Sequence, residues 1–97
     1  MKQQFFLRLI APRPTFMLDM TQDEKAIMQN HIGYWTTFLN KGIAIVFGPV
    51  LDPKGGYGIG IVSVDSEDHL KEIIANDPAN GLNQYEYYPM RAMFKQS

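Results

Sequence analysis

The stretch IAIVFGPVLDPKGGYGIGIVSV (residues 43–64) contains the signals that decide the fold. It opens with a continuous run rich in β-branched side chains, which predicts a strand over 43–50. The DPKGG motif that follows supplies turn residues, and residues 57–64 return as another strand, so the stretch is predicted to be a β-hairpin. Gly58 and Gly60 share one face of the returning strand, where they leave room for a close-packed helix or for a ligand.

A long helix is predicted immediately before the hairpin, over about residues 22–40. Thr21 followed three residues later by Glu24 is the capping-box signature of a helix start, and Gly42 is the expected left-handed stop. Between these ends the apolar side chains keep helical spacing, with His31 in the same stripe. The apolar positions are Ile27, Met28, Ile32, Trp35, Phe38 and Leu39.

A first strand is predicted at residues 3–10, because QQFFLRLI is rich in strand formers and free of breakers. Both of its faces are largely apolar, since Leu7 and Phe6 point to opposite sides. Residues 11–20 contain two prolines followed by several large apolar side chains. This segment is too broken to extend the strand, and we expect it to be a loop that packs over another part of the chain.

A short helix and a last strand are predicted after the hairpin. Asp65 or Ser66 caps a helix over about 67–76, which Asp77-Pro78 ends because the residue before a proline avoids the helical region. Residues 85–95 then form the last strand, in which Pro89 indicates an edge position or a bulge.

This order of elements defines the fold class. Strand, helix, strand, strand, helix, strand is the ferredoxin-like βαββαβ arrangement of an α+β domain, with a four-stranded antiparallel sheet and two helices on one face. The chain, residues 1–97, has the length of a single domain.

The other face of this sheet has no helix to cover it, yet its strands place apolar side chains there, among them Phe6, Ile10 and Tyr88. Exposed apolar patches of this kind mark interaction sites. We therefore expect a homodimer that forms through the open face. The alternative is a monomer in which the loop at 11–20 and the C-terminal residues fold over it.

Composition excludes several classes of function. Nine basic residues against ten acidic ones give a net charge of −1 without a basic cluster, which argues against binding to nucleic acid or to an anionic membrane. The chain has no cysteine, so we expect a cytoplasmic setting without disulfides or zinc–thiolate sites. The N-terminal residues MKQQFFLRLI are too broken for a signal peptide, and no segment has the length of a membrane span. Histidines and carboxylates do not stand at metal-ligand spacing, so no metal is expected.

His31 and Asp77 are the residues best suited to chemistry. Imidazole exchanges protons near neutral pH, and within the apolar stripe of a helix it can act as a base or an acid. The structural alternative is a core histidine bonded to a backbone carbonyl. Asp77 follows a helix end, where the helix dipole is unfavourable for a carboxylate. A histidine partner would compensate, as in hydrolytic triads; a turn made with residues 78–81 is the alternative.

Other residues are candidates for binding a substrate. Arg8 and Arg91 lie on outer strands and could hold a carboxylate, although paired surface arginines are more often solvated. Phe16, Tyr34 and Trp35 could form the apolar wall of a site.

Several motifs taken together resemble the YCII-related (YciI-like) family of the dimeric α+β barrel superfamily. The resemblance spans nearly the whole chain, and its most specific parts are the helical histidine, the Gly-Pro at the end of the second strand and the Asp-Pro at the end of the second helix. The matching residues are His31, Tyr34, Leu39, Gly42, Gly48-Pro49, Asp52, Gly55, Asp77-Pro78 and Gly81-Leu82. The chain departs from the pattern at Ala79 and in the apolar loop at 11–20.

The resemblance implies a homodimer and a polar pair, His31 and Asp77, that lines a pocket, with Gly48 among the substrate-binding residues. One related activity is a cofactor-free dehydrochlorination in which a His-Asp pair transfers protons. We therefore expect a lyase or isomerase without a cofactor, acting on a small metabolite such as an aromatic or lactone-like one. The alternative is a non-catalytic dimeric domain that binds a small ligand or serves an accessory role.

Overall fold

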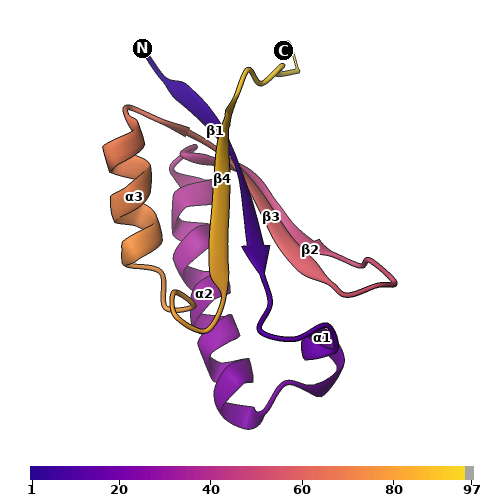
Figure 1. The fold of residues 1–97 in the computed structure, drawn as a ribbon. Coiled ribbons are helices and arrows are strands. Elements are labelled where there is room, and N and C mark those ends of the chain that lie inside the picture. The colour runs from indigo at the N-terminus through magenta and orange to yellow at the C-terminus, as the bar shows by residue number, and fades with distance from the viewer. Residues whose placement is uncertain (96–97) are drawn as a thin grey trace.

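The computed structural model describes residues 1–95 and contains four strands and three helices in that range (Figure 1). The elements are β1 (Gln3–Ile10), α1 (Phe16–Asp19), α2 (Gln22–Asn40), β2 (Ala44–Val50), β3 (Tyr57–Val64), α3 (Glu67–Ala75) and β4 (Gln84–Met90).

The sheet has the strand order β2-β3-β1-β4, and every neighbouring pair is antiparallel. Both long helices, α2 and α3, lie on the same side of it (Figure 1). The predicted ferredoxin-like α+β fold is therefore confirmed for the chain itself.

The core lies between the helices and the inner face of the sheet. Alternate residues of β1, Phe5, Leu7 and Leu9, are buried there, as the period of a strand requires. Trp35 of α2 and Leu70 of α3 pack into the same layer. The helices thus cover one face only.

The ends of the long helices follow the predicted local signals. The Thr21 side chain accepts a hydrogen bond from the Glu24 backbone N–H, and the Glu24 carboxylate accepts one from the Thr21 N–H, which is the complete capping box. Gly42 follows α2 with φ = 77°, a value that favours glycine. Of the two candidates for capping α3, it is Ser66 whose side chain accepts from the backbone N–H of His69.

The segment 11–20 was predicted to be a loop, but it contains the four-residue helix α1. It packs against the β2–β3 hairpin, because the Met17 side chain lies so close to Gly56 that a Cβ on this residue would clash with Met17 Sδ. Gly55, at φ = 143°, passes close to Pro14 in the same way. The segment therefore does not fold over the open face of the sheet.

The predicted extent of the last strand, 85–95, was wrong at its end, because β4 stops at Met90. Met90 pairs with Gln4, close to the start of β1, so β1 offers little further backbone to pair with. Pro89 lies within this strand and β4 is an edge of the sheet, which confirms the predicted edge position.

The outer face of the sheet carries a row of apolar side chains across all four strands. Val46 pairs with Ile61, Ile61 with Phe6, and Phe6 with Tyr88. Val46 is 46% exposed and Tyr88 is 54% exposed, and the two residues between them are half-buried. Within residues 1–95 this row has no covering element.

Candidate functional site

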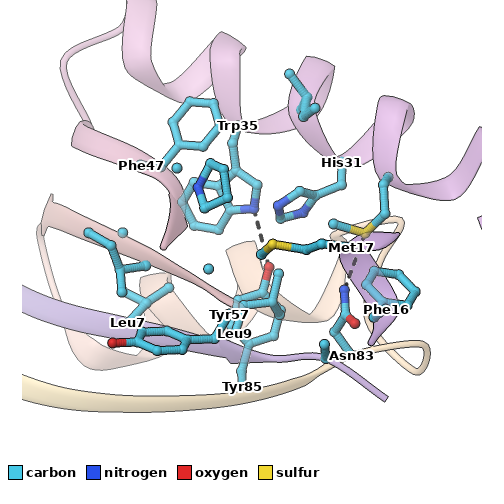
Figure 2. Close-up of a pocket in the computed structure, with 18 of the residues that line it drawn as sticks. Leu7, Leu9, Phe16, Met17, His31, Trp35, Phe47, Tyr57, Asn83 and Tyr85 are labelled. Carbon is cyan, nitrogen blue, oxygen red and sulfur yellow. Dashed lines mark hydrogen bonds between the residues drawn. The ribbon is translucent and has the colours of Figure 1, made fainter. Parts of the chain in front are cut away.

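A cavity of about 270 Å³ lies between α2 and the inner face of the sheet, beside α1 and the β2–β3 hairpin (Figure 2). Most of its wall is aliphatic, thioether or aromatic carbon. The lining residues are Leu7, Leu9, Ala11, Phe16, Met17, Met20, Met28, His31, Ile32, Trp35, Phe47, Gly48, Pro49, Leu51, Tyr57, Gly58, Ile59, Gly60, Asn83 and Tyr85.

Two glycines of β3 keep part of this wall free of side chains. A Cβ on Gly58 would lie 3.3 Å from the Cβ of Leu9, tighter than ordinary contact. A Cβ on Gly60 would lie 3.7 Å from the Cβ of Phe47, which is ordinary contact. Both glycines line the cavity, so of the two sequence-based interpretations, room for a helix or room for a ligand, their position fits the second.

His31 projects from α2 into this cavity, as Figure 2 shows. Its Nδ1 lies 2.9 Å from Oδ2 and 3.0 Å from Oδ1 of Asp77. The partner of the buried histidine is therefore a carboxylate and not the backbone carbonyl of the structural alternative. Within residues 1–95, no hydrogen bond reaches the other ring nitrogen, Nε2.

Asp77 lies just after α3 and is 4% exposed. Besides His31, it accepts hydrogen bonds from Trp35 Nε1 at 2.7 Å, from the Tyr85 hydroxyl and from the backbone N–H of Ala79 at 2.8 Å. The two interpretations drawn from the sequence, a histidine partner and a local turn, are thus both present. We call Asp77 and these four partners the Asp77 cluster.

The hydrogen bonds decide the charge of this carboxylate. Burial alone would raise the pKa of Asp77, but the bonds from His31, Tyr85, Ala79 and Trp35 outweigh it and hold the pKa below its usual value. Asp77 is therefore ionised at neutral pH and can only accept hydrogen bonds. Because it can only accept, Nδ1 of His31 must carry a proton, and in the neutral imidazole the lone pair then resides on Nε2.

Trp35 and Tyr85 hold the carboxylate from the cavity side. Burial, together with the bond to Asp77, raises the pKa of Tyr85, so its phenol remains a neutral donor. Trp35 Nε1 also lies 3.2 Å from the Tyr85 oxygen. These two contacts fix Asp77 in one orientation, and Asp77 in turn fixes the imidazole.

The cavity brings together some of the predicted site residues and leaves out others. Phe16, Trp35 and Gly48 line it with His31. Tyr34 does not, because its hydroxyl donates to the Ile73 carbonyl at 2.7 Å on the side of α2 that faces α3.

Neither predicted arginine lines the cavity. Arg8 is exposed on the outer face of the sheet, where its guanidinium carbon lies 4.5 Å from the ring centroid of Tyr57. Arg91 is exposed beyond the end of β4.

Two lining residues of interest, Asn83 and Tyr85, were missed in the sequence. Tyr85 lies on the same face of β4 as Tyr87, which stacks edge-on against Phe5 in the core. The alternation of β4 could therefore have indicated that Tyr85 points inward. Asn83 lies before the strand, where no periodicity applies.

Neither a metal-binding cluster nor a membrane-spanning helix occurs among residues 1–95. That part of the chain contains no group of three or more histidine, cysteine, aspartate or glutamate side chains placed to hold a metal ion. None of its helices is long and apolar enough to cross a membrane.

Fold and cavity define a small α+β domain with a buried histidine–aspartate pair at an apolar pocket. A model of the YCII-related domain family matches residues 4–93, and the chain belongs to this family. A search of curated proteins found no match for this chain.

Proposed function

We propose that this protein is a cofactor-independent enzyme of the lyase or isomerase type, which transfers a proton on a small, largely apolar metabolite. One observation carries the proposal: Nε2 of His31 borders an apolar cavity while Nδ1 is held by an ionised, buried carboxylate. A base that is oriented in this way and borders an apolar cavity is suited to abstract a proton from carbon or oxygen.

The size of the cavity supports a compact ligand. An apolar cavity of about 150 Å³ holds one benzene molecule, and this one has about 270 Å³. A substituted ring or a lactone fits such a volume. The Phe16 and Trp35 side chains would contact its apolar faces.

The chemical steps follow from the two nitrogens. Nε2 accepts a proton from the substrate, and the resulting imidazolium is stabilised by the negative charge of Asp77. If the proton returns to another carbon of the same molecule, the net reaction is an isomerisation. If the electron pair of the C–H bond forms a carbon–carbon double bond, and a leaving group on the adjacent carbon departs with the pair of its own bond, the net reaction is an elimination; the imidazolium then returns its proton to the leaving group or to water. Neither route consumes a redox equivalent.

Nitrogen NMR of the two histidines tests the proposed base. We expect neutral His31 to carry its proton on Nδ1 and the lone pair on Nε2. Asp77→Asn is expected to change this tautomer, because an amide can donate to Nδ1. His69 on α3 is the internal control and should be unaffected. A neutral His31 that carries its proton on Nε2 would contradict the proposal.

A proton-transfer assay tests the activity itself. The probe is α-angelica lactone, whose conversion to the conjugated isomer moves one proton and needs no cofactor. We expect His31→Ala to lower the rate by about 10²-fold or more, whereas His69→Ala should leave it unchanged.

The non-catalytic alternative has its own support, because apart from His31, Asn83, Trp35 and two tyrosines the lining is apolar or glycine. A domain that only binds a small ligand would keep its affinity in His31→Ala and would show no histidine-dependent proton transfer with any bound compound.

We also propose that the protein is a homodimer that pairs through the outer face of the sheet. The support is the uncovered apolar row from Val46 to Tyr88, with Ile61 at its centre. Sedimentation should give twice the mass of the 11.1 kDa chain. Ile61→Glu is expected to give monomers, whereas Lys71→Glu on the exposed side of α3 should not. A wild-type monomer at micromolar concentration would contradict the dimer.

A further inference from the structure

The inner face of β3 lacks side chains over half of its length. Gly58 and Gly60 lie two residues apart on this face, which continues with the buried Val62 and Val64. Neither glycine has a positive φ, so an ordinary residue can adopt the same backbone conformation. Glycine weakens the interior of a strand. The two missing side chains therefore need a reason other than backbone geometry.

The space beside Gly60 is left unused by the protein itself. The spacing of two begins at Gly56, and there the Met17 side chain fills the room that a Cβ would occupy. A Cβ on Gly60 would meet only Phe47 Cβ at 3.7 Å and the Val46 carbonyl oxygen at 3.8 Å, both ordinary contacts. Within residues 1–95, no atom of α2 comes within 4 Å of that position. Gly60 is thus not a glycine that admits a close-packed helix.

The neighbouring strands turn this bare backbone into a trough. Each glycine has a larger side chain on either side, all of them lining the cavity: Leu9 and Pro49 beside Gly58, and Leu7 and Phe47 beside Gly60. The floor is one strand wide, because adjacent strands lie about 4.8 Å apart. From Gly58 to Gly60 it runs for about 7 Å, two residues of a strand. A trough of this form suits a thin, elongated molecule that lies along β3.

The two ends of the trough differ. Beyond Gly60 it is closed by Val62, which is fully buried and belongs to the same core cluster as Trp35. Figure 2 shows Leu7 and Phe47, the neighbours of Gly60, toward one end of the cavity and His31 toward the other. Gly60 therefore lies at the end away from the imidazole.

The imidazole gives an independent indication of a ligand. His31 is 9% exposed and lines the cavity, and within residues 1–95 its Nε2 makes no hydrogen bond. A buried polar atom without a partner calls for one. A molecule that reaches from Nε2 to Gly60 is longer than one ring, in agreement with a cavity of about 270 Å³, when about 150 Å³ holds benzene.

We infer that Gly60 sets the length of the ligand, and that the site takes a planar, elongated molecule of about the size of two fused rings. One end of it lies at Nε2 of His31, and the other lies over the bare backbone at Gly60. The inference deepens the proposed function, on which it rests in placing the reacting end at His31. It makes Gly60 a residue that selects substrates by size without touching the base.

Phenol and 2-naphthol test this assignment, because they carry the same hydroxyl group and differ by one fused ring. The measured quantity is the dissociation constant of phenol divided by that of 2-naphthol. We expect this ratio to fall by about tenfold in Gly60→Ala and further in Gly60→Val, because each added side chain shortens the trough. Gly33→Ala is the control and should leave the ratio unchanged, since Gly33 is exposed on α2 with nothing within 4 Å of its Cβ position.

Urea denaturation separates this role from a structural one. Gly60→Ala should leave the urea midpoint unchanged or raise it, because the new Cβ meets only ordinary contacts and alanine loses less backbone freedom on folding. A lowered midpoint would show that the fold itself needs the room beside Gly60, and would overturn the inference.

A measurement on the wild type needs no variant. In the complex with 2-naphthol, we expect nuclear Overhauser effects between the ring protons and the Hα protons of Gly60, and none to those of Gly33. Absence of the Gly60 effects, an unchanged ratio in Gly60→Ala, or a wild type that binds neither phenol would each overturn the inference. Neither probe has to react, so these outcomes are independent of the lactone assay and of the tautomer of His31, which test the proposed function.

Discussion

Two clusters in this molecule bind carboxylates through hydrogen bonds, one in the buried interior and the other near the surface. In the Asp77 cluster, a carboxylate with no exposed side-chain surface accepts bonds from three side chains and one backbone N–H. In the second, Arg13 binds Asp19 through Nε at 2.7 Å and Glu24 through both terminal nitrogens. We call the latter, with Thr15, the Arg13 cluster. Its side chains remain partly exposed.

The pKa of each carboxylate involved is lowered, but for different reasons. The Arg13 guanidinium, with the Thr21 backbone N–H, lowers the pKa of Glu24 to about 2. Asp77 is instead bound by uncharged donors and by a histidine, and its burial raises the pKa and so opposes ionisation. Water can replace a lost partner in the Arg13 cluster, whereas a lost partner in the Asp77 cluster leaves a buried group unpaired. The number of hydrogen bonds in a cluster is thus a poor guide to how much the cluster contributes to the stability of the fold.

Removing the centre of the buried cluster should have the largest effect. Asp77→Ala leaves three side-chain donors and the Ala79 N–H without an acceptor, and we expect it to lower the free energy of unfolding by about 3–5 kcal/mol. Urea denaturation measures this loss. Asp65→Ala is the control, because Asp65 makes only an exposed ion pair with Lys2. Similar losses in the two variants would contradict the comparison.

Two tyrosines on one strand sharpen the comparison. The Tyr85 hydroxyl donates to buried Asp77, and the Tyr87 hydroxyl donates to exposed Glu67 at 3.0 Å. Tyr85→Phe is expected to cost about 1.5–3 kcal/mol, the usual contribution of a hydrogen bond to a charged group. Tyr87→Phe should cost clearly less, since water replaces the lost donor. Equal shifts of the urea midpoint would show that burial does not distinguish the two bonds.

Salt should distinguish the contributions of the two clusters to the loss of stability at low pH. The folded pKa of Asp77 is lowered, so its contribution is complete above its unfolded value of about 3.9 and is lost as the pH falls through the folded value. The pKa of Glu24 is lowered as well, so its contribution has the same sign, but its partly exposed pair with Arg13 is more strongly screened at about 1 M NaCl. At high salt, the wild type should therefore still lose stability as the pH falls. We expect this remaining loss to be absent in Asp77→Asn. A wild type whose stability no longer falls at low pH in high salt would contradict this.

The smallest effect is expected from the exposed cluster. Arg13→Gln should change the urea midpoint less than Tyr85→Phe does, and the change should shrink with added salt. The variant nevertheless loses a tie between the segment that carries α1 and the start of α2. A destabilisation as large as that of Asp77→Ala would show that this segment is held mainly by the arginine.

The helix ends and the turns could be read from the sequence because their causes are local. Thr21 with Glu24, Ser66 and Gly42 each act on backbone groups a few residues away, and each occurs as predicted. The short helix α1 was missed, since its stability comes from packing on the hairpin and from Arg13 rather than from its own four residues.

The candidate site was predictable only in part. The hypothesis of a His31–Asp77 pair placed two residues that do lie in contact, while their catalytic role stays a prediction. Arg8 could have been set aside, because it shares a strand face with Phe6 and not with the buried Leu7. Tyr34 could not have been set aside in this way, since its position one residue before Trp35 on the helix does not tell whether it faces the cavity or α3.

The sequence by itself determined the order of the four strands and the two longer helices, the caps, and the apolar excess on both faces of the sheet, because these depend on periodicity and on short-range backbone chemistry. Only the tertiary structure decided that Trp35, His31 and Tyr85 converge on Asp77, and that Asn83 Oδ1 has no hydrogen-bond partner within residues 1–95. These contacts join α2, the end of α3 and β4, and whether a polar atom is satisfied depends on burial and on three-dimensional distance, which no local pattern encodes.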